Sequence, residues 1–152
     1  MNKDKAEPAA KHTASDEEII FPEAELMING ELITVNEITY MQGMRLHNSI
    51  QPMIDDMATA FAKENPGLPL IAGVFASHNQ LLNEMILMTT GKDEDWLLSL
   101  NDEDGQALLM TFWIVNSGFF TRRLASKSMQ KMQDKIMAAK TSTLNTDKSS
   151  LN

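Results

Sequence analysis

The spacing of apolar residues changes near residue 36, from every second position to every third or fourth, which predicts a β-hairpin followed by helices. Between Ala24 and Val35, two apolar-rich arms flank Asn29-Gly30. This dipeptide favours a type I′ turn, because both positions accept positive φ and the turn matches the twist of the strands. The second arm alternates between two faces, Ile33 with Val35 and Leu32 with Thr34.

The rest of the chain predicts four or five helices with apolar stripes. Pro52 should separate the first two, and residues 70–90 should form one mostly buried helix that Gly91 stops. The expected N-caps are Asn36 for the first helix, Asp93 for a short one and Asn101 or Asp102 for the last. The expected core centres on Phe75, Leu82, Trp96, Leu109, Phe112 and Val115.

These patterns predict an α+β fold that is mainly α, with an N-terminal β-hairpin followed by a four- to five-helix domain. Residues 1–18 are charged and lack an apolar face, so they should form a disordered N-terminal tail. Residues 19–124 should form a single globular domain, and residues 125–140 a basic amphipathic helical extension. Residues 141–152 are rich in Ser, Thr and Asn and should form a disordered C-terminal tail.

Composition excludes several classes of protein. The 152 residues include no cysteine, which excludes disulfides, thiolate metal sites and a thiol nucleophile. The net charge of −8 argues against binding to nucleic acid. The N-terminus lacks the apolar core of a secretory signal, and no run is long enough to span a membrane, so we expect a cytoplasmic protein.

The polar residues do not form a catalytic pattern. Of the three histidines, His12 lies in the expected tail, while His47 and His78 lie on predicted helices without a second ligand nearby. Neighbouring acids such as Asp55 and Asp56 point in different directions on a helix, so they should not act as an acid–base pair. We therefore expect a protein that is not an enzyme and uses no metal or other cofactor.

Charge and methionine content indicate protein binding near the C-terminus. From Arg122 onward, seven basic and two acidic residues give a net +5, which leaves −13 for the rest of the chain. The chain contains 12 methionines, whose flexible side chains adapt to varied partners, although they also suit a soft core. Such a basic segment could dock on an acidic protein or simply be a solvated extension. The candidate partner-binding residues are Phe119, Phe120, Arg122, Arg123, Lys127, Met129, Lys131, Met132 and Lys135.

Three segments resemble a known family. They are residues 26–35 before a helix, residues 88–97 with a glycine stop and a Trp-bearing helix, and residues 115–120 with Asn116 before paired aromatic residues. In this order they are similar to the small tail assembly chaperones, and related tail-module proteins, that tailed bacteriophages encode beside their tape-measure genes. The likeness spans about residues 19–124 and does not include the basic extension.

The resemblance implies a non-enzymatic tail assembly chaperone in the host cytoplasm. It would bind the long helical tape-measure protein and keep it soluble while the tail assembles, with the tail-tube protein as a second partner and self-association as a further possibility. The alternatives are a structural tail protein retained in the virion, and a small DNA-binding regulator that uses helices near residues 77–91. The acidic body argues against the regulator.

Overall fold

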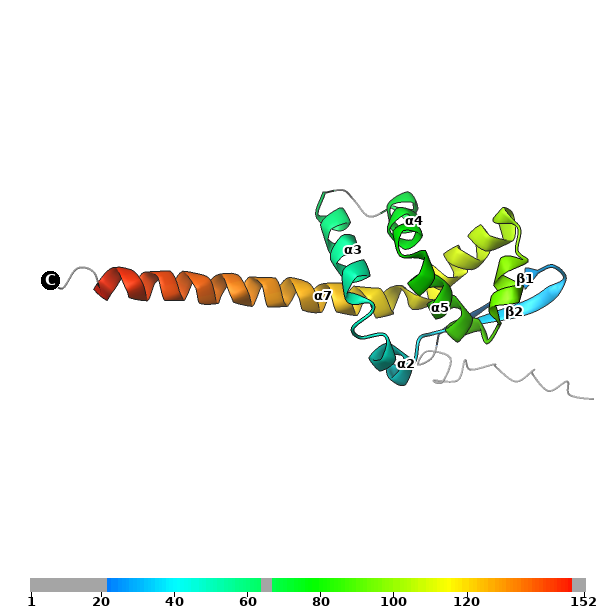
Figure 1. Cartoon of the computed structure of the whole chain (residues 1–152), viewed down its shortest axis with the longest axis horizontal. Coiled ribbons are helices and arrows are strands. Elements are labelled where there is room, and N and C mark those ends of the chain that lie inside the picture. The colour runs from blue at the N-terminus through cyan, green and yellow to red at the C-terminus, as the bar shows by residue number, and fades with distance from the viewer. Residues whose placement is uncertain (1–21, 64–66, 149–152) are drawn as a thin grey trace, which may run out of the picture.

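The computed structural model describes residues 22–63 and 67–148, which form a two-stranded antiparallel hairpin followed by six helices (Figure 1). The α+β, mainly α fold class is therefore confirmed. The tail expected over residues 1–18 lies outside the described residues. The elements are β1 (Glu23–Ile28), β2 (Glu31–Asn36), α2 (Tyr40–Arg45), α3 (Gln51–Lys63), α4 (Leu68–Ser77), α5 (Asn79–Thr90), α6 (Glu94–Leu98) and α7 (Asp102–Lys148).

The hairpin follows its local sequence signals. Asn29 and Gly30 both have positive φ, at 50° and 77°, as a type I′ turn requires. The register pairs Ile28 with Glu31 at the turn and Glu23 with Asn36 at the open end. Alternation is also confirmed, because Ile33 and Val35 are buried while Leu32 is exposed.

The first helix begins later than the sequence predicts. Thr39, and not Asn36, is the N-cap of α2, and it forms a capping box with Gln42. The Asn36 side chain instead donates a hydrogen bond to the Thr89 carbonyl at the end of α5, at 3.0 Å. The expected cap was wrong because this long-range bond ties the strand end to α5, and Thr39 offers the local cap.

The single helix expected over residues 70–90 is two helices, α4 and α5, with a break at His78. His78 has φ −119° and ψ 37°, which are not helical values, and its ring lies 2.7 Å from the Asp56 carboxylate on α3. The polar contact to α3 and the bend occur together, so tertiary contacts override the continuous helical pattern. The expected stop at Gly91, with φ 68°, and the cap at Asp93 are both confirmed.

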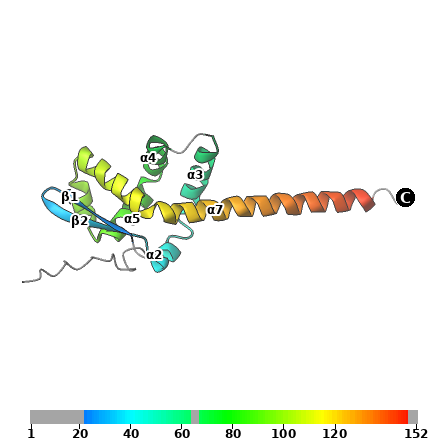
Figure 2. The same cartoon turned by 180° about the vertical axis from the view of Figure 1, so that it is seen from behind.

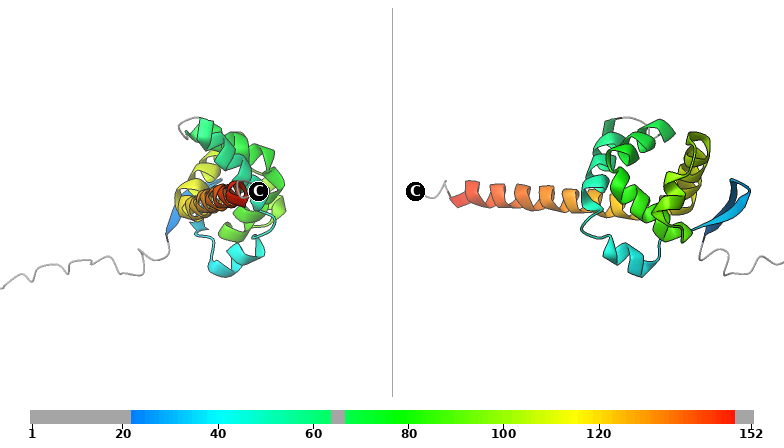
Figure 3. Two further views of the ribbon diagram at one scale, coloured as in Figure 1. Left: turned by 90° about the vertical axis from the view of Figure 1, so that its left-hand side faces the viewer. Right: turned by 45° about the vertical axis from the view of Figure 1, so that its right-hand side comes forward.

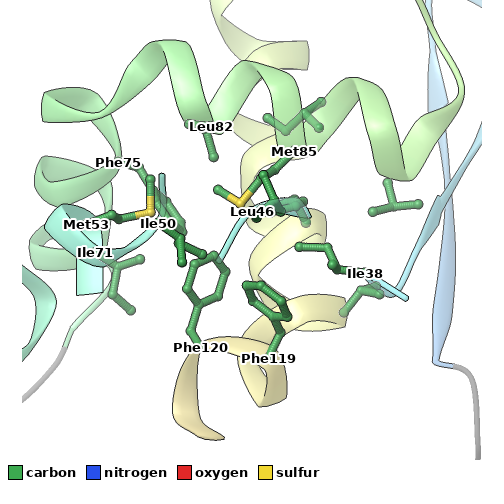
Figure 4. Close-up of a cluster of buried hydrophobic side chains, with 14 of the residues drawn as sticks. Ile38, Leu46, Ile50, Met53, Ile71, Phe75, Leu82, Met85, Phe119 and Phe120 are labelled. Carbon is green, nitrogen blue, oxygen red and sulfur yellow. The ribbon is translucent and has the colours of Figure 1, made fainter. Parts of the chain in front are cut away.

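Aromatic side chains from α4 and α7 form the centre of the core (Figure 4). Phe75 makes edge or tilted contacts with Phe112 and Phe120, at centroid distances of 6.1 and 5.5 Å. Of the six residues expected at the core, Phe75, Leu82, Phe112 and Val115 are buried. Trp96 and Leu109 are only partly buried and pack against the outside of the core.

Helix α7 contacts both strands and α3, and then projects from the body as a long arm (Figure 2). The other views agree on this arrangement (Figure 3). The Asn101 side chain caps the helix start by accepting a hydrogen bond from the Asp104 N–H at 2.8 Å. The helix includes residues 141–148, where a disordered tail was expected, although Ser, Thr and Asn are weak helix formers. The hydroxyls of Thr141 and Thr143 donate to the carbonyls of Met137 and Ala139, at 2.9 and 2.8 Å, so these polar side chains bond to their own helix instead of ending it. Residues 149–152 lie outside the described residues.

A matched pair of glycine variants tests the hairpin turn. An added Cβ meets nothing within 4 Å at either Gly30 or Gly73, but only Gly30 has positive φ. We expect Gly30→Ala to lower the free energy of unfolding by about 1–2 kcal/mol through backbone strain. Gly73→Ala, within α4, should raise it by up to about 1 kcal/mol. Denaturant unfolding measures both, and equal effects would contradict the turn conformation.

Candidate protein-interaction surface

Phe119 and Phe120, two of the expected partner-binding residues, belong to the core. Their exposed fractions are 2% and 0%. Figure 4 shows both rings pointing from α7 into the cluster of buried side chains. Both side chains are therefore core residues and are not accessible to a partner, because Gly43 on α2 lies against the Phe119 ring and Phe75 on α4 packs against Phe120.

Arg122 and Arg123 mark the place where α7 leaves the hairpin and α2. The Arg123 guanidinium lies 3.5 Å above the Phe119 ring and donates a hydrogen bond to the Phe119 carbonyl at 3.1 Å. Burial lowers the pKa of Arg123 below its ordinary value, and the charge of Arg122 lowers this pKa further. Arg122 is mostly exposed and pairs with Glu37 at 3.3 Å. Arg123 thus has a packing role, while Arg122 remains accessible.

Lys127 attaches α7 to α3. Its ammonium group forms an ion pair with Asp55 on α3, and its side chain is half-buried. Asp56, the next residue, pairs with His78 instead. The two carboxylates therefore face different partners, as the helix geometry predicts.

Beyond Lys127, we define residues 128–148 as the arm. Side chains 128–144 of the arm are all exposed. Met129 and Met132 have exposed fractions of 66% and 65%, unusually high for apolar side chains on an ordered helix. Lys131 and Lys135 are exposed on another face of the same turns. Four of the expected partner-binding residues, Met129, Lys131, Met132 and Lys135, therefore lie on the arm, and a fifth, Lys127, lies directly before it.

The sequence interpretation missed two further apolar residues on the arm. Met137 and Leu144 are 64% and 68% exposed. They are seven residues apart, so they lie on one face about two turns from each other. Their seven-residue spacing could have predicted an apolar face on a helix. It was not used because Leu144 lies in the segment that was expected to be disordered.

In the groove between α3 and α4, the hydroxyl groups are engaged by their own helices. A groove of about 470 Å³ lies between α3 and α4 and is lined by residues that include Thr59 and Ser77. Both hydroxyls donate to backbone carbonyls of their own helices, at 2.9 and 3.0 Å. Within residues 22–63 and 67–148, no three His, Asp or Glu side chains gather closely enough to hold a metal ion. In the same part of the chain, no helix is long and apolar enough to cross a membrane.

Residues 16–152 match a protein family described as "Family of unknown function (DUF6631)". The chain belongs to this family. Comparison with curated proteins finds no match, and comparison with solved structures finds none either. The function of the arm must therefore be inferred from its own residues.

Removal of the arm tests whether the body is complete without it. A chain shortened by residues 129–152 keeps the Lys127–Asp55 ion pair and every buried side chain described for α7. We expect its thermal midpoint to fall by less than about 2 °C at low protein concentration, because surface residues contribute little to stability. Calorimetry or circular dichroism measures this midpoint. A loss of more than about 5 °C would mean that the arm packs on the body.

Proposed function

We propose that this protein is a non-enzymatic tail assembly chaperone of a tailed bacteriophage, which acts in the host cytoplasm. Its client would be the helical tape-measure protein, kept soluble by binding while the tail assembles. The observation that carries the proposal is the arm, a helical segment that presents Met129, Met132 and Ile136 to solvent beside Lys131 and Lys135. The sequence resemblance described above supports the phage assignment.

The chemistry of the arm suits a helical client. Exposed methionines can repack against varied apolar side chains, so a client with a long and irregular apolar stripe can be held along its length. Lysines beside this apolar surface favour a client with acidic flanks, and their charges mainly increase the association rate. The acidic body would repel the same flanks, which directs the client to the arm.

The DNA-binding alternative has less support. Helix α5 includes most of residues 77–91, and its sequence NQLLNEMILMTT contains one Glu and no Lys or Arg. Contacts to phosphate groups need basic side chains, which this helix does not offer. The other alternative, a structural protein retained in the virion, could use the same surface. It would differ from a chaperone in remaining in the finished particle, so mass spectrometry of purified virions would distinguish the two.

A charge-reversal experiment tests the proposed use of the arm. The purified tape-measure protein would be refolded by dilution with the wild-type chain or with Lys131→Glu/Lys135→Glu. We expect the double variant to bind the client at least about tenfold more weakly at low salt, and to keep less of it soluble. The difference should shrink as salt is raised, because screening removes the attraction from both proteins.

The matched control is Arg45→Glu/Lys63→Glu, which makes the same change in net charge at exposed positions on the body. This control should bind like the wild type. Equal binding by all three proteins would overturn the role of the arm. Failure of the wild-type chain to bind the tape-measure protein at all would overturn the proposed client.

A further inference from the structure

Helix α2 presents apolar side chains that the rest of the body leaves exposed. Tyr40, Met41 and Met44 have exposed fractions of 78%, 62% and 53%, although α2 is only six residues long. Tyr40 and Met44 also line a groove of about 380 Å³ between α2 and α7, which we call the α2 groove. A groove of this volume beside exposed apolar side chains is typical of a binding site.

The side of the α2 groove that α7 forms is basic. Arg122 and Arg123 both line it, and Glu37 is the one carboxylate among the described residues that do so. The Arg122 guanidinium is largely exposed, and its hydrogen bond to Glu37 uses one of its five N–H donors. Residues 22–121 contain only three basic residues, so the groove concentrates positive charge on an acidic body. It therefore favours an occupant with both apolar and acidic side chains.

The chain enters the fold beside the α2 groove. Pro22, the first residue that the structure describes, lines a neighbouring groove together with Glu37 and Thr39. Glu37 and Thr39 also line the α2 groove, so the two grooves adjoin. An extended chain spans about 3.3–3.6 Å per residue, so the six residues before Pro22 can reach across about 20 Å. This reach includes the α2 groove.

Those six residues have the composition that the α2 groove favours. Residues 16–18 are Asp-Glu-Glu, and residues 19–21 are Ile-Ile-Phe. The family match also begins at residue 16, so the acidic and apolar residues belong to the region shared with the family, whereas residues 1–15 do not. Position along the chain, charge and apolar character thus indicate the same occupant.

We propose that residues 16–21 dock in the α2 groove of their own chain. The apolar side chains of residues 19–21 cover the exposed side chains of α2, and the acidic side chains of residues 16–18 pair with Arg122. The inference does not rest on the proposed function, because it concerns contacts within the chain. Docking closes the α2 groove to other proteins and leaves the arm accessible.

Disulfide trapping in the full chain tests this placement, because the chain has no cysteine of its own. In a glutathione redox buffer, Ile20→Cys/Met44→Cys should form an intramolecular disulfide at least about tenfold more readily than the control Ile20→Cys/Met137→Cys. Met137 is also an exposed methionine, but it lies about 21 Å beyond Arg123 along α7. Mass spectrometry of the intact protein separates a disulfide within one chain from one between two chains.

The chemical accessibility of Tyr40 gives a second test, since it is the only tyrosine in the chain. Ile20→Asp/Phe21→Asp places charges in the apolar part of the segment and should release it from the groove. Acetylation of the Tyr40 phenol by N-acetylimidazole should then become at least about threefold faster. The control Ala9→Asp/Ala10→Asp makes the same change in charge outside the segment and should leave the rate unchanged. Circular dichroism would show that all variants remain folded.

Equal disulfide formation by the two cysteine pairs would overturn the proposal, and so would a Tyr40 acetylation rate that Ile20→Asp/Phe21→Asp leaves unchanged. A disulfide that forms only between two chains would also overturn it, because the segment would then occupy the groove of a neighbouring copy.

Discussion

The buried side-chain amide of Asn116 holds the two parts of this fold together. Its oxygen accepts a hydrogen bond from the Ile38 N–H at 2.8 Å, and its nitrogen donates to the carbonyls of Asn36 and Phe112, at 3.3 and 3.2 Å. Buried peptide groups require partners, so the chain leaving β2 can take this path only where α7 supplies the amide. The bond thereby fixes α7 against the hairpin and determines where the arm leaves the body.

Features encoded by neighbouring residues could be predicted from the sequence. The Asn29-Gly30 turn, the Gly91 stop and the Asp93 cap each depend on the conformational preference of one or two residues. The break at His78 and the role of Asn36 could not be predicted in this way, because both involve partners far along the chain, Asp56 and the Thr89 carbonyl. Tertiary hydrogen bonds of this kind leave no local pattern.

The interaction surface could be predicted only in part, for a related reason. Helical spacing in the sequence places the lysines and the methionines of the arm on different faces, and in the structure both sets of side chains are exposed. It does not show how wide a face of α7 the body covers, so Phe119 and Phe120 were placed on the wrong side. The polar composition after Lys140 also concealed the continuation of the helix. One helix thus serves as core in its first half and as accessible surface in its second.

Hydrogen exchange measured by mass spectrometry tests this division of α7 most directly. An isolated helical segment is only marginally stable in water, so residues 128–148 need a partner to become protected. Amides of residues 102–124 should exchange slowly at every protein concentration. Amides of residues 128–148 should exchange quickly in dilute protein and more slowly once a partner binds the arm. Equal protection of both halves in dilute protein, or an arm that never gains protection, would contradict a helix completed by its partner.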